Sequence, residues 1–289
     1  MISPYRQIYI STSSFPVSHL SGIIDICKMH DIRALEFNTI QDFDIETLRM
    51  QDLSVLFHNY FPPPDEPFVL NLAAADETGL IKSRKMCMTA IDWTRQFKGS
   101  HYAAHAGYRG DIAVASLGNP PMLKASLGKI KLSTYGEAYQ TLLESILCLN
   151  AHAKEAGVRF LIENQVIASD YRAGGSELIL MVQSDELLRL IRDVDDNNFG
   201  LLVDLGHLKV TSETLGFDRK RFIDDVSPYI AAFHISDNDG RNDQHRPFTE
   251  NAWFLPILSD YPGATLTIEL ERAEVGDILR SRSILEWYL

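Results

Sequence analysis

The sequence predicts a single domain with the (β/α)8 TIM barrel fold, and three observations support this. Eight short apolar runs alternate with longer helix-like stretches along the whole chain. One such barrel takes about 250 residues, which is most of the 289 present. The first run is followed by Ser11-Thr12-Ser13-Ser14-Phe15, without the glycine-rich turn that an open, doubly wound sheet usually has there. We therefore expect one barrel over residues 1–289.

The eight apolar runs are the expected strands: Gln7–Ser11, Arg33–Phe37, Leu53–Phe57, Tyr102–Ala104, Arg159–Ile162, Phe199–Val203, Ile230–Phe233 and Ala264–Ile268. Each is followed by enough chain for a helix, for example Glu77–Phe97, Thr134–Ala156, Ser184–Val194, Asp218–Val226 and Val275–Tyr288. Ser184 is expected to cap its helix because acidic residues follow it directly. Gly157 is expected to end the helix before it.

Composition and charge narrow the class of protein. The net charge of −12 disfavours a nucleic-acid partner, because such proteins usually present a basic surface. No apolar run approaches the roughly 18 residues that span a bilayer, and residues 1–6 lack a signal-peptide pattern. Cys27, Cys87 and Cys148 lie far apart in helical stretches, so we expect buried free thiols and a cytoplasmic protein.

Six successive expected strands end in a residue type that binds metal. In a parallel barrel the carboxyl ends of the strands meet at one mouth, so these side chains are expected to converge. They are His58, His105, Glu163, Asp204, His234 and Glu269, and His207, Asp243 and His245 follow the sixth and seventh strands. A lone histidine at a strand end is more often simply hydrogen-bonded, but this many carboxylates and imidazoles at one mouth would be costly without a cation. The mixed donors suit Zn, Mn, Fe or Co better than Ca. The other histidines, at positions 19, 30, 101 and 152, are expected to be structural or solvated.

The order of these motifs resembles the xylose isomerase-like superfamily, which joins sugar isomerases and epimerases to endonuclease IV. The motifs that carry the resemblance are Glu163-Asn164, Asp204-Leu205-Gly206-His207, His234-Ile235-Ser236-Asp237-Asn238-Asp239-Gly240, Asp243-Gln244-His245 and Glu269. The resemblance to the isomerases implies one divalent metal ion, held by Glu163, Asp204, His234 and Glu269. It implies a sugar or sugar-phosphate isomerase or epimerase that transfers protons through an enediolate, with Glu163 and Glu269 as proton donor and acceptor.

The resemblance to endonuclease IV implies a different enzyme, a phosphodiester hydrolase with three zinc ions and nine ligands. All nine positions hold the matching residue type, so we expect one to three ions and keep this hydrolase as the alternative. The chain departs from the usual pattern at Ala106, where proline is common, and at Gly206, where cysteine is common in the endonuclease IV branch. After His245 it reads Arg246-Pro247-Phe248 in place of the glycine-rich segment found in both branches.

Two long loops, Phe61–Asp76 and Gly107–Ser133, are expected to cover the mouth. Arg109 and Arg246 are candidates for binding a phosphate or carboxylate of the substrate, with solvated surface charge as the alternative. Lys124, Lys129 and Lys131 lie in the second loop, where a phosphate backbone would be contacted. The expected partner is a small sugar or sugar phosphate; nucleic acid and membrane are not expected, and the oligomeric state is left open.

Overall fold

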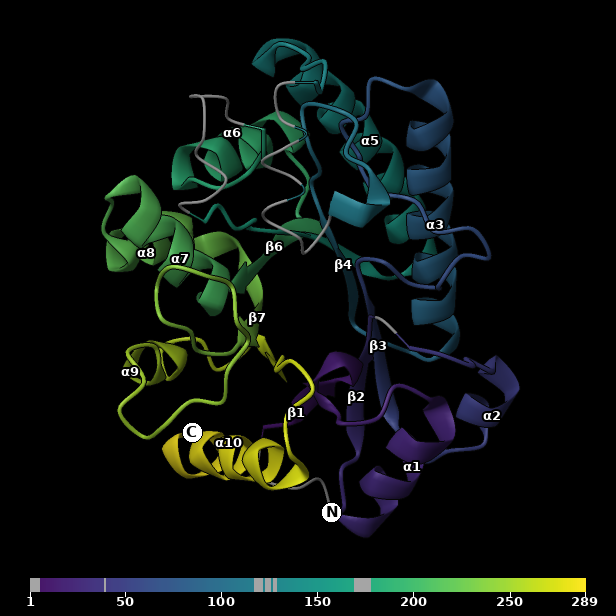
Figure 1. The fold of residues 1–289 in the computed structure, drawn as a ribbon, viewed down its shortest axis with the longest axis vertical. Helices are drawn as coiled ribbons and strands as arrows, with labels where there is room; N and C mark the ends of the chain where they lie inside the picture. Colours follow the sequence, from purple (N-terminus) through teal and green to yellow (C-terminus); the bar gives the residue numbers. More distant parts are fainter. Residues whose placement is uncertain (1–5, 39, 117–121, 123–125, 127–128, 169–177) are drawn as a thin grey trace.

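A computed structural model of the protein describes residues 6–38, 40–116, 122, 126, 129–168 and 178–289. Eight parallel strands follow one another around a closed barrel, in which β8 pairs with β1 (Figure 1). The strands are Ile8–Ser11 (β1), Ala34–Phe37 (β2), Ser54–His58 (β3), His101–His105 (β4), Arg159–Glu163 (β5), Phe199–Asp204 (β6), Ile230–Ile235 (β7) and Thr265–Ile268 (β8). The predicted (β/α)8 TIM barrel is therefore confirmed, and several strands run one or two residues further than the apolar runs because backbone pairing continues through polar residues.

Helices surround the barrel on its outside (Figure 1). They are Leu20–Met29 (α1), Ile45–Arg49 (α2), Glu77–Gln96 (α3), Tyr135–Ala156 (α5), Ser184–Val194 (α6), Leu205–Leu215 (α7), Arg219–Val226 (α8), Leu255–Leu258 (α9) and Val275–Tyr288 (α10). Within the described residues, none of these helices is long and apolar enough to cross a membrane.

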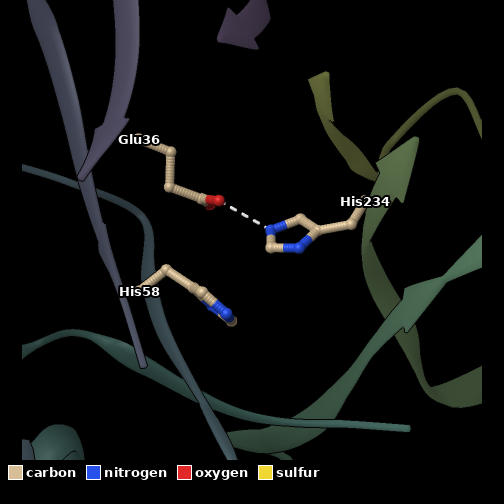
Figure 2. A group of neighbouring side chains, drawn as sticks. All are labelled: Glu36, His58 and His234. Atoms are coloured by element: carbon tan, nitrogen blue, oxygen red, sulfur yellow. Dashed lines mark ion pairs between the residues drawn. The ribbon is translucent and has the colours of Figure 1, made fainter. Parts of the chain in front are cut away.

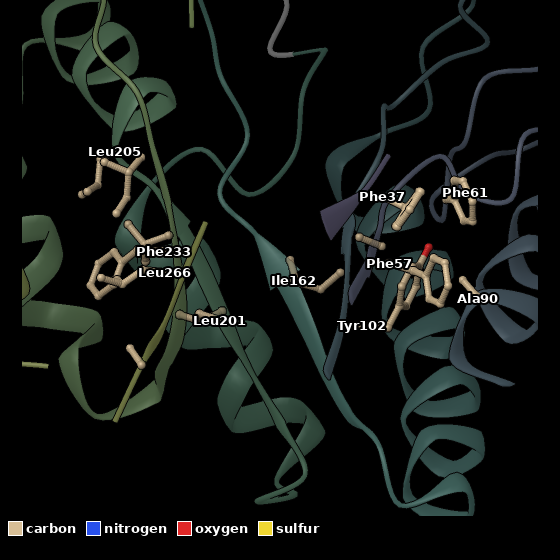
Figure 3. Packing of buried hydrophobic residues seen from close by; sticks show 14 of the residues in the cluster. Phe37, Phe57, Phe61, Ala90, Tyr102, Ile162, Leu201, Leu205, Phe233 and Leu266 are labelled. Carbon is tan, nitrogen blue, oxygen red and sulfur yellow. The ribbon is translucent and has the colours of Figure 1, made fainter. Parts of the chain in front are cut away.

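The hydrophobic core lies between the strands and the helices. Large side chains on the outer face of the strands, among them Phe57, Tyr102, Ile162 and Phe233, pack beneath the helices (Figure 3). Inside the barrel the corresponding layer is narrow and holds smaller side chains: Ala103, Leu161, Leu202 and Ala232. Because successive residues of a strand point to opposite faces, the buried outer residues determine which residues point into the barrel.

An aromatic cluster at β3 illustrates how the buried outer residues of a strand orient the inward ones. The Phe57 ring stacks on Phe61 at 5.0 Å and meets the edges of Trp93 and Phe97 at 5.9 and 5.6 Å. These contacts hold the outer face of β3 against α3. The next residue, His58, is consequently turned into the barrel.

The helix ends differ partly from the sequence-based expectation. Gly157 ends α5 in the left-handed conformation, with φ of 70°, as expected. Ser184 was expected to cap α6 but is its first helical residue, and the cap is Gln183. The Glu186 carboxylate reaches back to accept hydrogen bonds from the amides of Val182 and Gln183, which moves the cap one position earlier.

The cysteines are unpaired, as predicted, but only Cys27 and Cys87 are buried. Cys148 lies on an exposed position of α5, so its expected burial is wrong. The helical repeat of α5 places Leu142, Ile146 and Leu149 on the core side, and Cys148 falls outside that stripe.

His101 gives a prediction about stability. It shares the inward face of β4 with Ala103 and His105, its side chain is buried, and burial lowers its pKa to about 4. An unfolded histidine titrates near pH 6.5, so between about pH 6.5 and 4 the unfolded chain binds a proton that the folded chain does not. Falling pH across this window should favour unfolding by up to about 3 kcal/mol through this residue alone.

We expect the unfolding free energy of His101→Gln to fall less steeply than that of the wild type from pH 6.5 to 4, when both are measured by urea denaturation. Parallel pH profiles of the two proteins would contradict this assignment.

Candidate metal centre

The carboxyl ends of β3 to β8 form the mouth of the barrel. The residue that precedes each predicted ligand is apolar, at most 1% exposed, and directed toward the helices: Phe57, Ala104, Ile162, Val203, Phe233 and Ile268. Alternation along the strand then turns the next residue inward. Those inward residues are His58, His105, Glu163, Asp204, His234 and Glu269, and all but His105 are buried.

Four of these residues form one compact group. Glu163, Asp204, His234 and Glu269 each offer one ligand atom, and the four atoms lie within 4.8 Å of one another. His234 Nδ1 is 2.8 Å from Glu269 Oε2, 3.8 Å from Glu163 Oε1 and 3.9 Å from Asp204 Oδ2. We refer to these residues as the four-ligand group.

Two further groups adjoin it. His58 Nε2 and His105 Nε2 lie 3.1 and 2.9 Å from the second oxygen of Glu163. Asp243 Oδ2 lies between His207 Nε2 at 3.2 Å and His245 Nε2 at 3.1 Å. The structure thus brings all nine predicted ligands together at one mouth, in three groups of side chains of metal-ligand type; a fourth such group joins Glu36 to His58 and His234.

The buried polar atoms fit a cation. Among the described residues, Asp204 Oδ2, Asp243 Oδ1 and His58 Nδ1 are buried without a hydrogen-bond partner. Both oxygens of Glu163 come within 3.2 Å of imidazole nitrogens, yet they make no hydrogen bond of normal geometry. Burying such atoms unpaired is costly, and ligand atoms that crowd together in this way suit a shared divalent ion.

Imidazoles supply positive charge beside these carboxylates. Burial alone would raise the pKa of Glu163, but His105 and His58 outweigh that effect and hold this pKa well below its usual range. Burial would lower the pKa of His234, but Glu36 and Glu269 raise it well above its usual value. A divalent ion bound here would take over this charge balance and displace imidazole protons.

Asp204 joins the centre to the fold. It is the last residue of β6, and its Oδ1 accepts a hydrogen bond from the His207 amide at 2.7 Å, which caps α7. Asn164 braces the same strand end, because its side chain bonds to both the amide and the carbonyl of Asp204, at 2.8 and 3.1 Å. Oδ2 of Asp204 remains directed toward the four-ligand group.

Glu36 also belongs to this centre, although it was not among the predicted ligands. Glu36 lies in β2, is 1% exposed, and approaches His234 Nε2 at 2.6 Å (Figure 2). The sequence does contain a signal for it, a single acid inside the apolar run Ala34-Leu35-Glu36-Phe37. A charged residue at an inward position of a buried strand needs a partner, and that partner is His234.

The two candidate arginines lie on loops near the mouth. The guanidinium of Arg109 donates to the carbonyl of Ser133 at 3.1 and 3.0 Å, so it holds together the loop that follows β4. Arg246 pairs through its backbone with Asp237, at 2.8 Å in each direction, and its side chain is exposed beside His245.

Metal content is the direct measure of this centre. Asp204→Asn keeps an oxygen that can cap α7 but offers a neutral amide in place of a charged ligand. We expect purified wild-type protein to contain at least one equivalent of divalent metal by elemental analysis, and Asp204→Asn to contain much less. About one equivalent would indicate the four-ligand group alone, and close to three would indicate all three clusters.

Asp218→Asn is the matched control, since Asp218 caps the exposed start of α8 in the same way, by accepting from the Arg221 amide at 2.8 Å. Equal metal content in the two variants would show that Asp204 is not a ligand.

Comparison with known proteins extends these findings. The chain is 26% identical over 140 residues to the uncharacterized protein MJ1311 of Methanocaldococcus jannaschii, a match that covers 47% of this chain and 44% of that protein. The chain thus spans less than half the length of that relative. A D-tagatose 3-epimerase-like protein superimposes with a TM-score of 0.71 at 18% identity, over 98% of this chain and 96% of its own. The TTHB071 protein of Thermus thermophilus, whose crystals were soaked with zinc chloride, gives a TM-score of 0.64 at 17% identity, over 96% and 97% of the two chains.

The two solved structures agree with this chain in fold. A family model described as a xylose isomerase-like TIM barrel matches residues 38–288, which is most of the chain. The chain therefore belongs to the xylose isomerase-like TIM barrel family.

Proposed function

We propose that this protein is a divalent-metal-dependent isomerase or epimerase of a sugar or sugar phosphate. One observation carries the proposal. Glu163, Asp204, His234 and Glu269 each offer one ligand atom at the mouth of the barrel, and these four atoms lie within 4.8 Å of one another. Such a group combines ligands for one ion with two candidate acid–base residues.

Glu163, Asp204, His234 and Glu269 would hold the ion, and their mixed oxygen and nitrogen donors suit Zn, Mn, Fe or Co. When bound, a divalent ion supplies a Lewis acid that polarises a sugar carbonyl and the adjacent hydroxyl. The likeness in fold to a D-tagatose 3-epimerase-like protein agrees with a sugar substrate.

Glu163 and Glu269 would move the proton. Glu163 ends β5 and Glu269 directly follows β8, so they approach a bound substrate from different sides of the mouth. Asn38 donates to Oε1 of Glu269 at 2.9 Å and fixes that carboxylate, while His58 and His105 flank Glu163. One carboxylate would take a proton from a substrate carbon and the other would return one. Arg246, exposed beside His245, would bind a substrate phosphate or carboxylate, and Arg109, whose guanidinium is bonded to the Ser133 carbonyl, is the second candidate for that contact.

Proton exchange with solvent tests this reaction. Metal-loaded protein is incubated in deuterium oxide with a panel of keto- and aldo-sugars and their phosphates, and loss of a carbon-bound proton is followed by NMR. We expect exchange with at least one sugar, slowed about 100-fold or more in Glu269→Gln because an acid–base residue is lost.

The control is Glu271→Gln, which removes an exposed carboxylate two residues further along the chain. Absence of exchange over the whole panel, with metal bound, would argue against the proposed reaction.

One observation favours a second candidate, a metal-dependent phosphodiester hydrolase acting on damaged DNA. All nine ligand types lie together in three clusters, and grouped ions suit the attack of hydroxide on a phosphodiester. Against it stands the net charge of −12. Lys129 and Lys131 are exposed in the segment after β4, and Lys124 lies outside the described residues.

A duplex with an abasic site separates the two candidates. We expect no binding at low salt and no metal-dependent cleavage, because the acidic surface repels the phosphate backbone. Tight binding that weakens as salt is raised, accompanied by metal-dependent cleavage, would put the hydrolase first.

A further inference from the structure

Glu36 is a buried carboxylate for which the proposed reaction has no use. It is 1% exposed and lies on β2, a strand that carries none of the nine candidate ligands. Its Oε1 lies 2.6 Å from His234 Nε2, and its Oε2 accepts a hydrogen bond from the Thr267 hydroxyl at 3.3 Å. Figure 2 shows the carboxylate directed at the edge of the His234 ring, with His58 to one side.

We propose that Glu36 is a positioning residue for metal binding: it holds the His234 imidazole in the tautomer and orientation that present Nδ1 to a divalent ion. The inference rests on the metal site of the proposed function. Glu36 is not one of the nine candidate ligands, and it has no part in the proposed proton transfer.

The two nitrogens of His234 face different partners. Nδ1 faces the four-ligand group, with Glu269 Oε2 at 2.8 Å and Asp204 Oδ2 at 3.9 Å. An imidazole binds metal through the nitrogen that carries no proton, so binding through Nδ1 leaves the proton on Nε2. Glu36 Oε1, 2.6 Å from Nε2, is the acceptor toward which that proton would turn, although the pair does not have hydrogen-bond geometry in this structure. The negative carboxylate also increases the electron density that Nδ1 can donate.

The alternative role for Glu36 is that of a metal ligand, since Glu36, His58 and His234 form a further group of side chains of metal-ligand type. An ion bound by both His234 Nε2 and Glu36 Oε1 would lengthen their 2.6 Å separation, because zinc–nitrogen and zinc–oxygen bonds are each about 2 Å long. The number of ions bound by Glu36→Gln separates the two roles. The carboxylate is buried and faces Nε2 of His234, whereas the four-ligand group lies at Nδ1 of the same ring.

Thr267 completes the arrangement. Its hydroxyl, on the inward face of β8, engages one oxygen of Glu36 and leaves the other for His234. Thr267→Val would remove this hydrogen bond and retain the charge of Glu36. It offers a second, milder way to disturb the same contact.

The test is a calorimetric titration with zinc ion in the presence of a competing chelator. It is carried out on wild type, Glu36→Gln, Thr267→Val and Glu186→Gln. The last is the control, because Glu186 is a partly buried carboxylate that caps α6 far from the centre. We expect Glu36→Gln to bind zinc about 10- to 100-fold more weakly with unchanged stoichiometry, Thr267→Val to show a smaller loss, and Glu186→Gln to match wild type. A long-range proton–nitrogen NMR spectrum of the zinc-bound protein should show His234 protonated at Nε2, with this signal shifted in Glu36→Gln.

Each outcome decides the matter. Unchanged zinc affinity in both Glu36→Gln and Thr267→Val would overturn the inference, and so would loss of one bound ion in Glu36→Gln, which would make Glu36 a ligand. If Glu36→Gln does not fold, Thr267→Val decides by the same affinity criterion. A wild type that binds no zinc would overturn both the inference and the metal site. The expected zinc affinities together with no proton exchange on any sugar would overturn the proposed function and leave the role of Glu36 intact.

Discussion

Repulsion among buried carboxylates is the constraint on which the mouth of this barrel depends. Glu163, Asp204 and Glu269 converge where little water can screen them, and none is more than 8% exposed. Five of the nine histidines of the chain lie against these carboxylates or beside Asp243. These carboxylates can lie together only if positive charge, from protons or from divalent ions, is present at the mouth. The imidazoles gathered there carry such protons or bind such ions.

The side chains of the centre are oriented by the outer face of the strands, where the residue before each strand-end ligand is apolar and buried. Phe57 illustrates the principle: its ring is held by Phe61, Trp93 and Phe97, and the direction of His58 follows from the alternation of the strand. The same relation holds at each later strand, where one buried apolar residue precedes one inward polar residue. Packing and site chemistry are therefore determined by neighbouring positions of the same strands.

This relation also explains how much could be predicted from sequence. Each of the six strand-end ligands stands where an apolar run stops, and the closure of a parallel barrel brings such ends together, so fold and convergence could both be inferred. For Glu36 the sequence offers only a lone acid inside an apolar run, and its partner His234, on a strand distant in sequence, could not be identified. The bond from Arg109 to Ser133 could not be predicted either, since the two residues are 24 positions apart and no sequence pattern pairs them. The cap of α6 was misplaced by one residue because a side chain further along, that of Glu186, determines it.

The junction between β6 and α7 restricts how this protein could diversify. Barrels of this class acquire new specificities mainly by lengthening and reshaping the segments that follow their strands. Here no such segment exists, because one residue, Asp204, both ends the strand and caps the helix. An insertion at that point would separate the carboxylate from the amide it caps and move Oδ2 away from its neighbours. Relatives that share this junction are therefore expected to vary in segments that follow other strands, such as residues 59–76, while the end of β6 stays unchanged.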